Sequence, residues 1–129
     1  YNGQYLSFSF PPKIAQKPDN MQAVYTDMSL WDVHRSQFPW ILFNDPERFA
    51  DIANSILLIN REGGYMPKWP FANGPTGCMI GAHGTTVLSD WVVKEAKNTL
   101  SKSSLEEVLS FMLRNANTNT AHDSRTNPA

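Results

Sequence analysis

A chain of 129 residues can bury one hydrophobic core, and a formal net charge of −1 leaves no basic surface for nucleic-acid backbones. We therefore expect no nucleic-acid partner. We expect no membrane span either, because apolar runs such as Ile56–Ile59 are far shorter than the roughly 20 residues that cross a bilayer. The single cysteine, Cys78, excludes an internal disulfide and a cysteine-rich zinc site, and we expect it to be a small buried residue.

The first third of the chain is expected to contain little helix. Residues 1–24 combine three prolines with alternating aromatic residues, a pattern that favours an extended lead-in or an edge strand. A short helix is plausible from about Met28, but Pro39 lacks a backbone donor and biases Phe38 away from helical angles. We expect that helix to kink or end at Pro39.

The strongest helix signal lies at residues 46–62. Asp45 can cap this helix, Pro46 suits its first turn, and Glu47 complements the helix dipole. Apolar residues then recur at helical spacing, at Phe49, Ile52, Ala53, Ile56 and Ile59. The pair Gly63-Gly64 supplies the stop.

The second half of the chain is predicted to hold a long irregular loop and two further helices. The loop is "GGYMPKWPFANGPTG", residues 63–77, whose glycines and prolines argue against regular structure. One helix is expected at about residues 80–97. A final helix is expected to begin with a capping box at Ser103 or Ser104, and its apolar stripe is Leu105, Val108, Leu109, Met112 and Leu113. The polar run after Asn115 is typical of a loop or a frayed tail.

Each predicted helix offers one apolar face, so we predict an all-α fold with an extended N-terminal lead-in. Three or four such helices can close a small bundle, or they can be part of a larger helical barrel whose other helices cover their stripes. The chain begins with Tyr1, which favours the second arrangement. In that case we expect the chain to be unstable alone, because the stripes within 49–59 and 105–113 would face solvent.

Charged and aromatic residues alternate within residues 25–41, "YTDMSLWDVHRSQFPWI". A helix that only packs would keep its Asp and Arg side chains away from its apolar face. The adjacent Trp31 and Asp32 offer a flat apolar surface and a two-oxygen acceptor, which together suit a ring that carries hydroxyl groups. From the residues alone, a core position for Trp31 and an ordinary exposed carboxylate at Asp32 remain open alternatives.

A family resemblance rests on two motifs, "YTDMSLWDVHRSQFP" and, about thirty residues later, "GGYMPKWPFANGPTGCMIGAHG". Both resemble the opening of the helical domain of glycoside hydrolase family 92, the calcium-dependent exo-acting α-mannosidases. The resemblance covers about residues 22–95 and extends more weakly to "AHDSR" near the end. It implies a β-sandwich packed on an (α/α)6 barrel. Residues 1–24 would then be a lead-in or linker from a preceding domain, and residues 25–129 the first helices of an incomplete barrel.

The resemblance implies an enzyme that removes terminal α-linked mannose from oligosaccharides or N-glycans with inversion, and α-1,2 linkages are the expected substrates. Inversion needs two carboxyl groups separated by roughly 6.5 to 9.5 Å. In the family, the catalytic Glu and Asp and most calcium ligands lie in motifs downstream of the matched segment. We therefore expect no catalytic residue and no calcium ligand within this chain. A secreted or extracytoplasmic location is suspected from the family alone.

The resemblance also implies that this segment supplies part of the sugar-binding subsite. Asp32 would accept hydrogen bonds from sugar hydroxyls, with Trp31 beside it. Arg35 lies three positions after Asp32, so the two can pair on one helix face and orient the carboxylate.

Trp69, Lys68 and His83 are further candidates for the same subsite, and His34 is not. Trp69, with Lys68 next to it, would rim the pocket, and packing is the alternative for Trp69. His83 lies where relatives read Met-Ile-Gly-Asp-His-Ala, but Ala82 replaces the acidic neighbour that could orient the imidazole. His34 is expected to be a surface or hydrogen-bonded histidine and not a base. A metal site is not expected there, because no other histidine lies near it in the sequence.

Two other function classes stay open beside the enzyme. One is a divergent or truncated protein that binds sugar without hydrolysing it. The other is a helical interaction module whose aromatic loop contacts a protein partner, since aromatic residues are enriched in protein interfaces. The downstream catalytic carboxylates would distinguish the enzyme from both.

Overall fold

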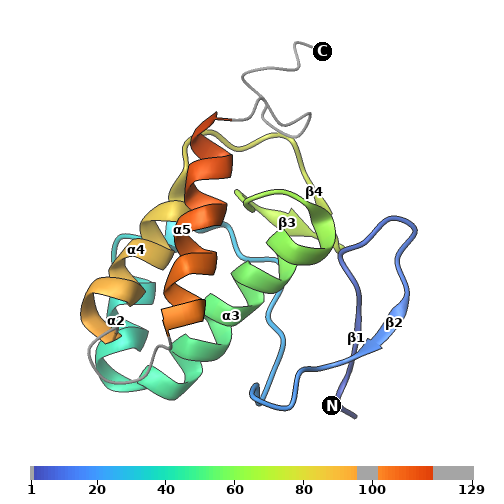
Figure 1. The fold of residues 1–129 in the computed structure, drawn as a ribbon, viewed down its shortest axis with the longest axis horizontal. Coiled ribbons are helices and arrows are strands. Elements are labelled where there is room, and N and C mark those ends of the chain that lie inside the picture. The colour runs from blue at the N-terminus through green and yellow to red at the C-terminus, as the bar shows by residue number, and fades with distance from the viewer. Residues whose placement is uncertain (1, 96–101, 118–129) are drawn as a thin grey trace.

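The structure is a computed structural model that describes residues 2–95 and 102–117 (Figure 1). Its elements in chain order are β1 (Gln4–Leu6), β2 (Ile14–Gln16), α1 (Leu30–Val33), α2 (Gln37–Asn44), α3 (Pro46–Gly63), β3 (Pro70–Phe71), β4 (Gly74–Pro75), α4 (His83–Glu95) and α5 (Lys102–Asn117). Helices make up about half of the chain and its strands are short, so the fold is mainly helical, as predicted. The (α/α)6 barrel stays a prediction. None of the helices in the described ranges is long and apolar enough to cross a membrane.

The N-terminal segment forms a small hairpin that projects to one side of the helices (Figure 1). β1 and β2 are antiparallel, with Tyr5 opposite Ala15. The Glu62 carboxylate near the end of α3 fixes the hairpin, because it accepts hydrogen bonds from the Tyr5 hydroxyl and from the Phe8 amide, the latter at 2.9 Å. The predicted extended conformation is therefore present, and its two strands pair with each other.

A second set of hydrogen bonds ties the rest of the lead-in to the middle of α3. The Asp51 carboxylate accepts from the backbone amides of Gln22, at 3.0 Å, and Ala23, at 2.9 Å. The Ser55 hydroxyl accepts from the Tyr25 amide at 2.9 Å and donates to the Asp51 carbonyl oxygen at 2.7 Å. Asp51 and Ser55 are both buried, and these bonds satisfy their polar groups.

We expect Asp51→Ala to lower the free energy of unfolding by about 1.5 to 3 kcal/mol, because it removes charge-assisted hydrogen bonds and leaves two amides without a partner. Urea denaturation of the chain, followed by circular dichroism, measures the loss. Glu47→Ala is the matched control, since Glu47 is an exposed carboxylate on the same helix and makes none of these bonds. Equal losses in the two variants would contradict the anchoring role of Asp51.

Pro39 lies inside a helix, which differs from the prediction that a helix would kink or end there. α1 ends at Val33, and α2 begins at Gln37, so Pro39 is the third residue of α2. The first four amides of a helix have no intrahelical acceptor, so a missing donor is tolerated in that turn. The prediction was wrong because the helix boundary falls before the proline.

The predicted helix at residues 46–62 is confirmed as α3. The Asp45 carboxylate accepts a hydrogen bond from the Arg48 amide at 3.1 Å, as a helix cap does. Gly64 has a φ of +76°, the left-handed conformation that ends many helices.

The apolar stripe of α3 is buried within the chain itself, contrary to the expectation that it would face solvent. Residues of α2 and α4 pack against α3, and the core includes Leu30, Phe38, Leu42, Phe49, Ile52, Ala53, Ile56, Leu57, Leu88 and Trp91. Part of the apolar stripe of α5 does face solvent, as expected, because Leu109 and Leu113 are 55% and 52% exposed. The α3 stripe therefore supplies the core of this chain, and it is no longer a reason to expect the isolated chain to be unstable.

The loop at residues 63–77 contains a regular element that was not expected. β3 and β4 pair in an antiparallel hairpin, with Phe71 opposite Gly74. Ala72 and Asn73 form its turn with φ values of 48° and 65°, which match the twist that two-residue hairpins need. Cys78 follows this hairpin and is exposed, so the prediction of a buried cysteine was wrong.

The two C-terminal helices are present with shifted boundaries. α4 begins at His83, three residues later than predicted, because Gly81 has a φ of +85° that is not helical. The predicted end of α4 at Lys97 lies outside the described residues. The tail predicted after Asn115 begins later, because α5 continues to Asn117, and the rest of that tail also lies outside the described residues. α5 already includes Ser103 and Ser104, so neither residue is its cap.

Candidate functional site

The four-residue helix α1 presents Trp31 and Asp32 at the surface. Its first residue, Leu30, is fully buried, and the Leu30 amide donates to the Lys68 carbonyl oxygen at 3.1 Å. This anchor holds α1 against the loop that precedes α4. Asp32 is exposed, and the Trp31 side chain is 42% exposed, so Trp31 is not a core residue.

The Asp32 carboxylate is oriented by a serine and not by an arginine. The Ser29 hydroxyl donates to Oδ2 of Asp32. Among the described ion pairs none joins Arg35 to Asp32, so the pairing that we considered is wrong. The Arg35 guanidinium instead lies 5.4 Å from the centre of the Trp31 ring, in cation–π geometry. The carboxylate therefore keeps acceptor positions for a ligand.

His34 and His83 lie together, although they are far apart in the sequence. Their rings are stacked, with centroids 4.1 Å apart and an interplanar angle of 21°. His34 is a hydrogen-bonded histidine, as expected, because its Nδ1 lies 2.9 Å from the carbonyl oxygens of both Leu30 and Trp31. The pKa of His83 is lowered from its usual value, first by burial and then by the positive charges of His34 and Arg35.

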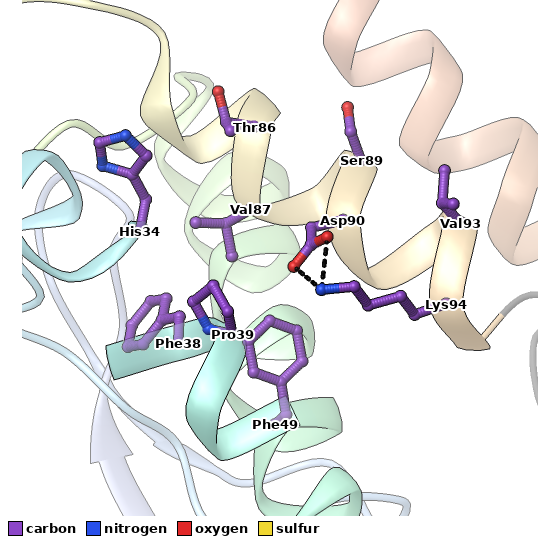
Figure 2. A pocket seen from close by; sticks show the side chains of 10 residues that line it. All are labelled: His34, Phe38, Pro39, Phe49, Thr86, Val87, Ser89, Asp90, Val93 and Lys94. Carbon is purple, nitrogen blue, oxygen red and sulfur yellow. Dashed lines mark hydrogen bonds and ion pairs between the residues drawn. The ribbon is translucent and has the colours of Figure 1, made fainter. Parts of the chain in front are cut away.

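A pocket of about 430 Å³ lies beside this cluster, between the α1–α2 segment and α4 (Figure 2). Its lining residues are His34, Phe38, Pro39, Phe49, Thr86, Val87, Ser89, Asp90, Val93 and Lys94. An ion pair between Asp90 and Lys94, with Nζ 2.9 Å from Oδ1, lies on the α4 side. The volume is within the range of small-ligand pockets.

The Trp69 side chain packs against the β3–β4 hairpin. Its half-buried ring makes an edge contact with Phe71, with centroids 6.1 Å apart and an interplanar angle of 63°. No ring contact in the described part of the chain joins Trp69 to Trp31. Lys68 reaches α1 through its backbone carbonyl, so the loop contacts the site by main chain. The rim role of Trp69 stays a prediction.

The described residues do not form a calcium site. Within residues 2–95 and 102–117, no group of three or more His, Cys, Asp or Glu side chains lies together in a way that could hold a metal ion. Calcium takes six to eight oxygen ligands, so these residues do not fit it by themselves. The expectation that calcium is bound by residues outside this segment stays a prediction.

Comparison with known proteins decides the family. The model of the glycosyl hydrolase family 92 catalytic domain matches residues 1–128. The chain belongs to glycoside hydrolase family 92. Its fold is similar to that of a family 92 α-mannosidase from Bacteroides thetaiotaomicron, with a TM-score of 0.78 and 32% sequence identity over 93% of this chain. A second structure of that bacterial enzyme, in complex with mannoimidazole, matches with the same values.

The family 92 chain described here spans 15% of the length of the bacterial enzyme in each of these structures. No curated protein sequence matches it. The family match confirms the resemblance drawn from the two sequence motifs.

The sequence motifs led to Trp31 and Asp32 as neighbours, but not to the contact between His34 and His83. Both histidines lie within the recognised motifs, at residues 34 and 83, but nothing in their spacing along the chain indicated that the two rings meet. The glycine at 81 was a signal only for the position of the His83 ring, because a Cβ there would lie 2.5 Å from Nε2 of His83. Only a glycine lets the His83 ring occupy this position without a shift.

Proposed function

We propose that this family 92 chain supplies part of the mannose-binding subsite of an α-mannosidase, in which Trp31 contacts the sugar ring and Asp32 accepts hydrogen bonds from its hydroxyls. Family membership and the likeness to a bacterial α-mannosidase that has been solved with mannoimidazole support this proposal. The observation that carries it is the exposed Trp31–Asp32 pair on a helix anchored by the buried Leu30.

The geometry suits recognition of a sugar. Because Ser29 holds one oxygen of the Asp32 carboxylate, a hydroxyl group of a ligand meets an oriented charged acceptor, and such hydrogen bonds are stronger than neutral ones. Arg35 lies over the Trp31 ring, and an indole has two faces, so the opposite face serves the apolar side of a pyranose. In this proposal the site binds and orients the sugar, and the acid and the base come from outside this segment.

The finer features of the proposal come from the family resemblance. They are inversion at the anomeric carbon, preference for α-1,2-linked mannose in oligosaccharides or N-glycans, a secreted or extracytoplasmic location, and dependence on calcium. The described residues do not form a calcium site by themselves, and we propose that the calcium ligands come from outside them. Inversion further requires two carboxyl groups on opposite sides of the sugar ring, which we place outside this segment.

The proposed activity is tested by hydrolysis of aryl glycosides with the enzyme that contains this chain. We expect release of the aryl group from the α-mannoside and no comparable release from the β-mannoside or the α-glucoside. Hydrolysis of the α-glucoside in preference to the α-mannoside would overturn the proposal. The anomer formed first, followed by proton NMR, tests inversion in the same reaction.

We expect the 129-residue chain alone to show no measurable hydrolysis of an aryl α-mannoside, because both catalytic carboxyl groups are placed outside it. Uncatalysed glycoside hydrolysis is extremely slow, so even a weak enzyme would be detected above background. Release of the aryl group is followed by absorbance with and without added calcium. Turnover that persists through repurification would show that the acid and the base lie within this chain.

A further inference from the structure

The stacked imidazoles of His34 and His83 connect α1 to the first residue of α4. His34 also caps α1, because its backbone amide donates to the Leu30 carbonyl oxygen at 3.2 Å. Its ring nitrogen Nδ1 lies 2.9 Å from the carbonyl oxygens of Leu30 and Trp31. A carbonyl oxygen only accepts hydrogen bonds, so Nδ1 carries the hydrogen and Nε2 is the nitrogen that takes up a further proton. His34 thus holds the backbone that carries Trp31.

The His83 ring is held in the stack by the backbone around it. Because Gly81 has a φ of +85° and no Cβ, the ring lies directly against its backbone. Gly84 permits a second close approach, since a Cβ there would lie 2.8 Å from the Pro67 carbonyl oxygen. These two glycines fix the start of α4, and therefore the His83 ring, against the loop that also anchors Leu30.

We propose that the His34–His83 pair is a positioning element that holds α1, and with it Trp31 and Asp32, in place only while the pair carries at most one proton. The inference rests on the proposed function of Trp31 and Asp32. A doubly protonated pair would place two cations face to face at a ring distance of 4.1 Å, beside a third cation at Arg35. Sugar binding would then weaken in acid.

The surrounding charges do not offset this repulsion. The pKa of His83 is lowered by burial and by the charges of His34 and Arg35. Among the described side chains, the charged groups on the elements packed around the pair are Asp32 and Arg35 from the α1 segment, Lys68 from the loop, and Asp90 and Lys94 from α4. Asp90 pairs with Lys94, and neither Asp90 nor Asp32 is among the groups that shift the pKa of His83, which is lowered overall.

The direction of the pH effect follows from the lowered pKa of His83. As the pH falls, the unfolded chain binds a proton at His83 near the usual value of about 6.5, before the folded chain does. The stability that the neutral imidazole contributes is therefore present above that pH. It is lost as the pH falls through the lower, folded-state pKa.

Histidine titration by NMR on the 129-residue chain tests the coupling, between pH 5 and pH 8. We expect the stacked pair to take up its second proton in a separate step that lies below the usual histidine range, because the pKa of His83 is lowered. We also expect the amide of Leu30, which donates to Lys68, to lose hydrogen-exchange protection with the second step, while the amide of Ile56 in α3 keeps its protection. Independent titration of the two rings, or unchanged protection at Leu30, would overturn the proposal.

Two variants and a control separate a charge effect from a packing effect. In His34→Phe an aromatic ring remains but cannot be protonated, so the pKa of His83 should rise and the pH dependence of Leu30 protection should vanish. Gly81→Ala pushes the His83 ring out of the stack, so it should uncouple the two titrations by another route. Asp19→Asn removes a charge from the exposed lead-in and should change neither step. A His34→Phe variant that keeps the pH dependence at Leu30 would contradict the inference.

These readouts need no sugar, so they separate this inference from the proposed function. If the mannose site is wrong, Asp32→Asn keeps native kcat/KM in the enzyme that contains this chain, whatever the histidines do. If the positioning role is wrong, the histidines titrate independently while the kinetic effect of Asp32→Asn remains.

Discussion

Asp32→Asn is expected to lower kcat/KM of the proposed α-mannosidase by about one to two orders of magnitude. The substitution keeps the shape of the side chain but replaces a charged acceptor by an amide, one end of which donates. Hydrogen bonds to charged groups contribute roughly 1.5 to 3 kcal/mol, which corresponds to that loss of transition-state stabilisation. Steady-state kinetics on an aryl α-mannoside measures it. Folding should barely change, because Asp32 is exposed.

The matched control for this substitution is Asp19→Asn. Asp19 is an exposed carboxylate in the lead-in, so the same chemical change there should leave both kcat/KM and the melting temperature unchanged. If Asp32 were a structural surface group, Asn would cost under about 1 kcal/mol of stability and leave the kinetics intact. Native kcat/KM in Asp32→Asn would remove the sugar-binding role.

Ile56→Ala is expected to lower the free energy of unfolding by about 2 to 5 kcal/mol, as truncations of buried aliphatic side chains do. Ile56 is fully buried at the centre of α3, in the cluster that includes Leu88 and Trp91 of α4. Loss of its side chain removes apolar contacts and leaves a cavity that the packed helices fill only in part. Because domains of this size are stabilised by about 5 to 15 kcal/mol, the effect is large.

Urea denaturation of the 129-residue chain measures this effect, and Ile80→Ala is the matched control. Ile80 is 62% exposed in the segment before α4, so the same truncation should change stability by no more than about 0.5 kcal/mol. Similar losses in the two variants would mean that the α3 stripe is not the core of the chain. A loss confined to Ile56→Ala supports a chain that folds around α3.

The local sequence was sufficient to predict secondary structure where the decisive interactions join residues that are neighbours along the chain. The start of α3 depends on Asp45 and Pro46, and its end depends on Gly64 in a left-handed conformation. All of these act within one turn of the helix, so a single sequence could predict them. The same reasoning failed at Pro39, because whether a proline interrupts a helix depends on where the helix begins.

Burial was harder to predict, since it depends on which elements meet. The apolar stripe of α3 is visible in the sequence whatever the fold. The sequence did not show, however, that α2 and α4 of this chain would cover that stripe. Cys78 is a residue type that is usually buried, but it follows a hairpin at the surface and is exposed. The β3–β4 hairpin was missed for a related reason, because its turn uses Ala72 and Asn73 in place of the usual Asn-Gly.

By itself the sequence determined the family, the position of α3 and the adjacency of Trp31 and Asp32, because motifs and helix signals are properties of consecutive residues. Only the tertiary structure decided that Arg35 lies over Trp31 and not on Asp32, and that His34 stacks on His83. Those contacts arise where the buried Leu30 and the loop before α4 bring two distant segments together. The spacing of residues along the chain does not predict such contacts, because they depend on how the core packs.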